Sequence, residues 1–197
     1  MTAFEWAAAL APVEPPAAYY CRNDSDWHGR FEKFVPYVRA EGVVDTNLPL
    51  VASVLGEVGD NCFAHNVAAW PDLMGCWFEW SVNIPVREIR WVVADRGRGI
   101  LSSLAAVRPE LQRHRDALRV AFTEQISGRQ PEDRGRGLKV ALLALAQLTA
   151  GTFALRSGDA EFSCTLPYDA QGVAERIQTV APFVRGAYCA MVYRYAD

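Results

Sequence analysis

The chain has 197 residues, of which 51% are hydrophobic and 22% charged, so it can bury a substantial core and is most simply one domain. Its net charge of -3 gives no overall attraction for nucleic acid, so any site for a polyanion must be local. Because no positively charged region precedes the first apolar residues and Glu5 interrupts them, we do not expect a secretory signal. The sequence contains no apolar run of the roughly 20 residues that a membrane span needs, and no C-x-x-C pair. We therefore expect a cytoplasmic protein with five reduced cysteines, no membrane segment and no nucleic-acid partner.

The first 45 residues are expected to form an N-terminal arm and an edge strand. An Ala-rich start, the run Pro12–Pro16 and the polar cluster Asn23–Asp26 predict a short helix or loose arm followed by a turn. The weak alternation over Phe31–Arg39 predicts a strand, and Pro36 places it at the edge of a sheet because proline cannot donate to a central ladder.

A helix is expected from about Leu48 to Ala69. Asn47 is a suitable N-cap, the apolar residues that follow it have helical spacing, and Pro71 is expected to stop the helix.

Four polar residues interrupt this otherwise apolar helix. Residues four apart share a helix face, so Glu57, Asn61 and His65 are expected to line up, with Asp60 beside them. We interpret Asp60 as a cap or solvated residue and His65 as an ordinary helix-end histidine, which leaves Glu57 and Asn61 as the residues of chemical interest.

Two strands joined by a short turn at Pro85 are expected next, over Cys76–Ile84 and Glu88–Ala94. The second strand leads directly into Asp95-Arg96-Gly97-Arg98-Gly99-Ile100. Two glycines one residue apart after a strand permit a tight turn and a close approach of the backbone to a ligand.

The segment Leu101–Gln130 is helix-prone and highly charged, with Pro109 as an expected helix start. A glycine-rich loop over residues 130–137 then opens onto an apolar helix, Leu138–Ala150. Free N–H groups and the helix dipole make such a helix N-terminus a natural phosphate site.

The C-terminal part is expected to be mainly strands. Thr152–Ser157 and Glu161–Leu166 flank an expected turn at Gly158-Asp159, a short helix is expected within Gln171–Val180, and Ala187–Tyr195 is expected to be the last strand. The whole order predicts an α+β fold with helices on one face of a mixed sheet.

Three motifs follow one another along the chain: Glu57-x-x-x-Asn61, Asp95-x-Gly97-x-Gly99 and Gly135-x-Gly137-Leu138. In this order, with a strand before the second motif and a helix after the third, they resemble the ATP-binding domain shared by gyrase, Hsp-type chaperones, histidine kinases and mismatch-repair ATPases, the GHKL superfamily. The resemblance covers roughly residues 45 to 195. It implies a Bergerat-type two-layer sandwich over residues 46–197, with an ATP lid at about 100–134 and the arm at 1–45.

The resemblance also implies roles for particular residues. Asn61 would bind the Mg2+ that bridges the nucleotide phosphates, Glu57 would activate the attacking water or hydroxyl, and Asp95 would accept a hydrogen bond from the adenine amino group. The family often has glycine at the position of Lys139, and this lysine is expected either to meet a phosphate or to change how the lid packs. The remaining expected nucleotide contacts are Gly97, Gly99, Ile100, Arg134, Gly135, Arg136, Gly137 and Leu138.

The implied function is that of an ATP-binding regulator with ATP and Mg2+ as cofactors. The layout is similar to stand-alone anti-sigma-factor-type serine kinases or detached histidine-kinase-type domains, so we expect slow ATP hydrolysis or phosphorylation of a protein partner, with a homodimer as a further possibility. The alternative is a non-catalytic interaction module with a nucleotide-gated or vestigial pocket. A Rossmann domain is disfavoured because no G-x-G-x-x-G follows the first strand.

Overall fold

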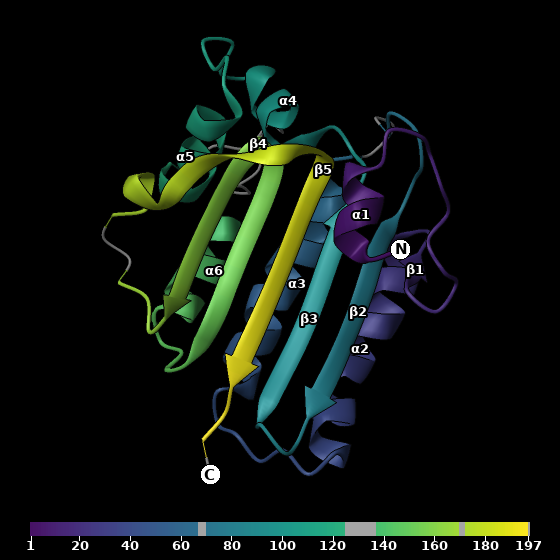
Figure 1. The fold of residues 1–197 in the computed structure, drawn as a ribbon, viewed down its shortest axis with the longest axis vertical. Helices are drawn as coiled ribbons and strands as arrows, with labels where there is room; N and C mark the ends of the chain where they lie inside the picture. Colours follow the sequence, from purple (N-terminus) through teal and green to yellow (C-terminus); the bar gives the residue numbers. More distant parts are fainter. Residues whose placement is uncertain (67–69, 125–136, 170–171, 197) are drawn as a thin grey trace.

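The computed structural model describes residues 1–66, 70–124, 137–169 and 172–196 and has an α+β fold (Figure 1). In these ranges five strands form one open sheet in the order β1-β2-β3-β5-β4. The strands are β1 (Tyr20–Cys21), β2 (Cys76–Asn83), β3 (Glu88–Asp95), β4 (Gly151–Leu166) and β5 (Ile177–Arg194). The helices are α1 (Ala3–Ala8), α2 (Asp24–Ala40), α3 (Leu48–Ala64), α4 (Gly99–Ala105), α5 (His114–Thr123), α6 (Gly137–Leu145) and the short 3-10 turn η1 (Ala174–Arg176).

Every strand pair in the described sheet is antiparallel, so the prediction of a mixed sheet is wrong. The predicted pair β2 and β3 is confirmed, with Cys76 opposite Asp95 and Asn83 opposite Glu88. The directions of the strands after β3 were mispredicted, because a connection that contains helices can place the next strand either parallel or antiparallel to β3. The following strand, β5, then inserts between β3 and β4 and runs antiparallel to both.

The predicted turn at Gly158 is instead an irregularity inside one long strand, β4. Ser157 pairs with Ala187 and Gly158 with Val184, so the register shifts at this point. Gly158 adopts φ 65, a left-handed conformation that glycine reaches without the steric cost of a side chain. The helix predicted within residues 171–180 is reduced to η1, because β5 already begins at Ile177.

The predicted edge strand over residues 31–39 is wrong, since this segment belongs to helix α2. Asn23 caps the helix by accepting a hydrogen bond from the Asp26 amide at 2.9 Å. The buried residues Trp27, Phe34 and Val38 recur with helical spacing, although Pro36 lies inside the helix. The weak alternation near Pro36 concealed this longer period.

Helix α3 begins at Leu48 as predicted but ends at Ala64, five residues before the predicted end. His65 is its C-cap, and residues 67–69 lie outside the described ranges. The predicted helix start at Pro109 is also wrong, because α5 begins at His114. Helix α6 ends at Leu145, whereas the prediction extended it to Ala150.

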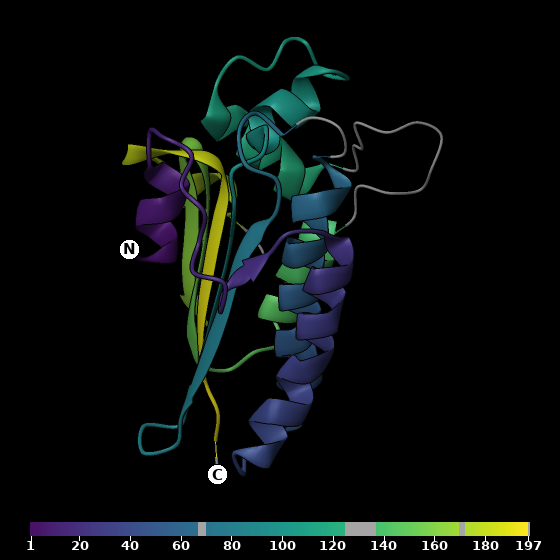
Figure 2. The same ribbon diagram turned by 90° about the vertical axis from the view of Figure 1, so that its right-hand side faces the viewer.

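Helices lie on both faces of the sheet, although α1 covers only part of its face, so the prediction of helices on one face is only partly right. Figure 2 shows α2, α3 and α6 on one face and α1 on the opposite face. The α1 residue Trp6 packs against Trp77, with ring centroids 6.1 Å apart. The buried Arg96 guanidinium fixes this arm by donating to the carbonyls of Trp6 and Ala9 and to the Asp72 carboxylate. No helix in the described residues is long and apolar enough to cross a membrane.

Gly59 allows α2 and α3 to pack closely. A methyl group on Gly59 would overlap the buried ring of Trp27, whose Nε1 donates to Asp60 Oδ1 at 2.7 Å. We predict that Gly59→Ala lowers the free energy of unfolding by about 1–3 kcal/mol, the usual range for overpacking, measured by urea denaturation. Gly56→Ala is the matched control, because its methyl group would meet only the Phe31 ring edge at 3.1 Å. A Gly59→Ala protein at least as stable as the control would contradict this packing.

Candidate functional site

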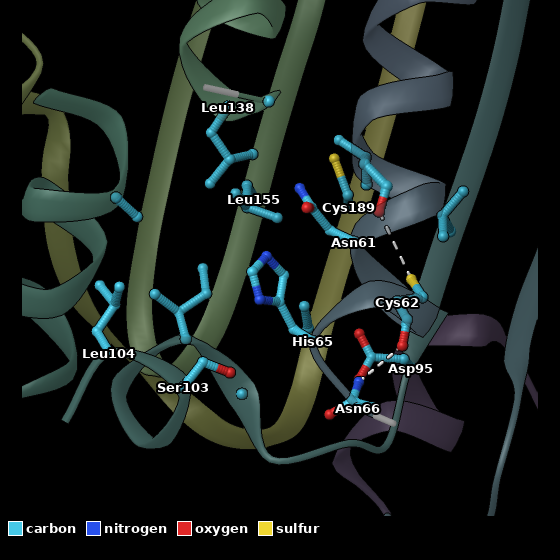
Figure 3. Close-up of a pocket in the computed structure, with 17 residues that line it drawn as sticks. Asn61, Cys62, His65, Asn66, Asp95, Ser103, Leu104, Leu138, Leu155 and Cys189 are labelled. Carbon is cyan, nitrogen blue, oxygen red and sulfur yellow. Dashed lines mark hydrogen bonds between the residues drawn. The ribbon is translucent and has the colours of Figure 1, made fainter. Parts of the chain in front are cut away.

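A cavity of about 110 Å3 lies at the end of β3, enclosed by all four of the helices α3 to α6 and by β4 and β5 (Figure 3). Most of its wall is apolar, including Val58, Leu104 and Leu155. The polar groups that line it are Asn61, His65, Asn66, Asp95 and Ser103, together with the thiols of Cys62 and Cys189. An apolar cavity with a few polar groups is the usual form of a small-molecule site.

The structure brings six of the predicted site residues into the wall of this cavity, from three separate parts of the chain. They come from α3, from the end of β3 and start of α4, and from the start of α6. The six residues are Asn61, Asp95, Gly99, Ile100, Gly137 and Leu138.

Other predicted site residues are not in the cavity wall. Gly97 and Lys139 do not line the cavity, and Arg134, Gly135 and Arg136 lie outside the described residues. Glu57 is also outside the wall but adjoins it, because a methyl group on Gly137 would lie 2.6 Å from Glu57 Oε2. The carboxylate is therefore next to the N-terminal residue of α6.

Asp95 is the carboxylate among the described residues that line the cavity, and it is 4% exposed. Its Oδ1 accepts hydrogen bonds from the Gly97 amide at 2.7 Å and from Asn66 Nδ2 at 3.3 Å. Burial raises the pKa of Asp95 from 3.8 to about 6, although donors from Gly97, Cys62, Ala187 and Asn66 oppose the rise. At neutral pH Asp95 is therefore mainly ionised and acts as a hydrogen-bond acceptor.

Glu57 is a partly buried carboxylate. Burial, and then the charge of Asp60, raise the pKa of Glu57 above its usual value. Asp60 itself binds the Trp27 indole, so it joins α3 to α2 and does not merely cap or solvate the helix. A carboxylate whose pKa is raised toward neutrality is a better proton acceptor.

The turn from Asp95 to Ile100 is stabilised by contacts with Ser157 of β4. Gly99 adopts φ 73, which favours glycine, and a methyl group there would lie 3.0 Å from Ser157 Oγ. The Ile100 amide donates to the same hydroxyl at 3.0 Å. The tight turn predicted from the two glycines is present, and Ser157 of β4 is the partner that the sequence pattern did not identify.

Among the cavity residues that were not predicted as site residues are His65 and Asn66. Figure 3 shows the His65 ring in the cavity between Asn61 and Ser103. Its spacing of four residues from Asn61 was the signal that could have identified it. Asn66 gave no comparable signal, since a single asparagine after a helix is usually an ordinary cap or turn residue.

The cavity is smaller than most ligand sites, which are about 300–1,000 Å3. Its volume is about 110 Å3. The described residues also include no group of three or more His, Cys, Asp or Glu side chains arranged to hold a metal ion. A Mg2+ ion at the Asn61 amide oxygen would therefore take most of its ligands from phosphates and water, as Mg2+ commonly does.

Comparison with models of known protein families gave no match, and no curated protein matches the sequence significantly. The resemblance to the GHKL superfamily therefore depends on the three motifs themselves.

Proposed function

We propose that this protein is an ATP-binding regulator of the histidine kinase-like, or GHKL, type. It binds Mg-ATP and either hydrolyses it slowly or transfers the phosphoryl group to a protein partner. The observation that supports the proposal best is the convergence of Asn61, Asp95 with Gly99, and Gly137 on one cavity, although these residues are far apart in sequence. This combination is what the three motifs require of an ATP site.

The apolar wall and Asp95 suit the adenine base. A planar ring gains from contact with Val58, Leu104 and Leu155, and the Asp95 carboxylate would accept a hydrogen bond from its amino group. A base with a carbonyl oxygen at that position would place two acceptors against each other. The proposal therefore includes a preference for adenine over guanine.

The phosphates would lie toward Asn61 and the start of α6. An amide oxygen is a suitable hard ligand for Mg2+, and the N-terminus of α6 at Gly137 favours an anion. Bound Mg2+ would neutralise phosphate charge. Glu57, next to Gly137, would accept the proton of the attacking water or hydroxyl.

Calorimetry with Mg-ATP tests the proposal. We expect Mg2+-dependent binding to the purified protein, and Glu57→Ala should retain it within a few-fold while lowering phosphate release or partner phosphorylation by about 100-fold or more. Glu32→Ala, at an exposed position of α2, is the control and should change neither quantity. Absence of ATP binding by the unmodified protein would overturn the proposal.

The small cavity favours a second candidate, a non-catalytic interaction module. A space of about 110 Å3 and an Asp95 carboxylate already bound by protein donors would suit a vestigial or nucleotide-gated pocket. The rate of ATP turnover distinguishes the catalytic regulator from the non-catalytic module. If ATP binds and Glu57→Ala leaves a measurable turnover rate unchanged, or if no turnover exists, the second candidate is supported.

A further inference from the structure

Asn66 connects three parts of the candidate site through one side chain. It lies directly after the C-cap of α3 and is 3% exposed, with its backbone amide bonded to the Phe63 carbonyl at 3.2 Å. Its Nδ2 donates to the Cys62 carbonyl at 2.8 Å and to Asp95 Oδ1 at 3.3 Å. Its Oδ1 accepts from the Arg98 amide at 2.9 Å. The end of α3, the Asp95 carboxylate and the turn after β3 therefore share one amide group.

The orientation of this amide is set by its partners. The two groups near Nδ2 are both acceptors, and the group near Oδ1 is a donor. Turning the amide over would place acceptor against acceptor and donor against donor. Because the side chain is buried, water could not relieve that mismatch. Figure 3 shows Asn66 beside Asp95, with Cys62 above them.

Two glycines make room for the pair formed by Asn66 and Asp95. A methyl group on Gly97 would overlap the Asn66 amide. A methyl group on Gly186 would overlap Asp95 Oδ1 and lie 2.5 Å from the Asp95 carbonyl oxygen. Neither glycine has a positive φ, so both are required for space and not for backbone conformation. Gly97, which was predicted to let the backbone approach the nucleotide, lets it approach Asn66.

We propose that Asn66 is a positioning residue that orients Asp95 and the turn after it for recognition of the base. The inference rests on the proposed ATP-binding function and goes beyond the three motifs, which do not include Asn66. With Oδ1 held by Asn66 and Gly97, the carboxylate cannot rotate freely, and Figure 3 shows its second oxygen directed away from Asn66. A fixed acceptor loses less conformational entropy when it binds a ligand than a mobile one does.

A double-mutant cycle tests whether Asn66 acts through Asp95. Asn66→Ala is expected to weaken Mg-ATP binding at least tenfold by calorimetry, and Asp95→Asn is expected to weaken it at least as much. In the Asp95→Asn background, Asn66→Ala should change the affinity less than twofold, because its target is already removed. Asn83→Ala, at the exposed end of β2, is the control and should leave the affinity unchanged.

A second readout does not require nucleotide. The carboxyl carbon of Asp95, followed by NMR, should titrate near pH 6 in the unmodified protein, and Asn66→Ala should raise this midpoint because the Asn66 amide lowers the pKa of Asp95. An unchanged midpoint, or independent and additive losses of affinity in the cycle, would show that Asn66 only fills space and would overturn the inference. If the unmodified protein binds no ATP, the proposed function fails while the titration still decides the role of Asn66.

Discussion

We expect ionisation of Asp95 to lower the free energy of unfolding by roughly 3 kcal/mol as the pH rises, and Asp95→Asn is expected to remove this pH dependence. The pKa of Asp95 rises from 3.8 to about 6 on folding because burial disfavours the charged carboxylate. Between these values the folded state binds more protons than the unfolded state. Asp95 therefore contributes most to stability below about pH 4, and its contribution is lost as the pH rises through about 6.

The measurement is the free energy of unfolding by denaturant at several pH values between about 3.5 and 7, for the unmodified protein and the variant. The difference, unmodified protein minus Asp95→Asn, should fall by roughly 3 kcal/mol over this range. Any constant cost of the substitution cancels from that change. A difference that stays flat would show that Asp95 is hydrated in solution.

Asp72→Asn is a control of opposite sign. Burial alone would raise the pKa of Asp72, but hydrogen bonds from Arg96 and the Leu73 amide, together with the nearby charges of Arg96 and Arg185, hold it below its usual value. Asp72 therefore stabilises the fold above about pH 4, and that contribution is lost as the pH falls further. The free energy of unfolding of the unmodified protein minus that of Asp72→Asn should therefore increase with pH in the acid range. If removing any carboxylate had the same effect, the two variants would instead show changes of the same sign.

Among glycine-to-alanine substitutions near the candidate site, Gly186→Ala is expected to lower the free energy of unfolding most. Besides overlapping Asp95 Oδ1, the added carbon would lie 2.5 Å from the Asp95 carbonyl oxygen and 2.6 Å from the Gly97 amide nitrogen. These are backbone atoms of β3 and the following turn, so no side-chain rotation can relieve the contact. We expect a loss of at least about 3 kcal/mol in the free energy of unfolding, measured by urea denaturation.

Two alanine variants test whether this effect comes from local crowding. Gly29→Ala adds a methyl group with no heavy atom within 4 Å, and it lies in α2, so it should stabilise by up to about 1 kcal/mol. Gly137→Ala meets the far end of the flexible Glu57 side chain, so it should cost far less stability than Gly186→Ala while moving the proposed base. Similar losses for Gly186→Ala and Gly137→Ala would contradict the crowding at Gly186.

The sequence allowed much of the fold around the candidate site to be predicted, because those elements have strong local patterns. The start of α3 follows from apolar spacing after Asn47, and the pair β2 and β3 follows from two β-rich runs around Pro85. The predictions were wrong where local signals conflict. Pro36 argued against a helix, yet the buried side of α2 with Trp27 and Phe34 prevails because packing against α3 outweighs a single unfavourable residue.

The contents of the site were only partly predictable. Asn61, Asp95 and Gly137 belong to the three motifs whose resemblance to the GHKL superfamily implied a shared pocket, and all three line the cavity. Asn66 and Gly186 belong to no motif, and their importance depends on atoms brought together from distant positions in the chain. A sequence pattern records spacing along the chain and does not record such contacts.

The sequence alone therefore determined the α+β class and the strand pair next to the site, because periodicity and turn chemistry are local properties. The residues proposed to bind nucleotide follow from the resemblance of three motifs to the GHKL superfamily. Only the tertiary structure decided the antiparallel direction of β5, the packing of α1 on part of the second sheet face and the cavity at the end of β3. It also showed that Asp95, expected from the motif to accept a hydrogen bond from adenine, is a buried carboxylate whose Oδ1 accepts hydrogen bonds from Asn66 and Gly97. Burial, strand direction and side-chain contact are long-range properties, so they are fixed only when distant segments pack together.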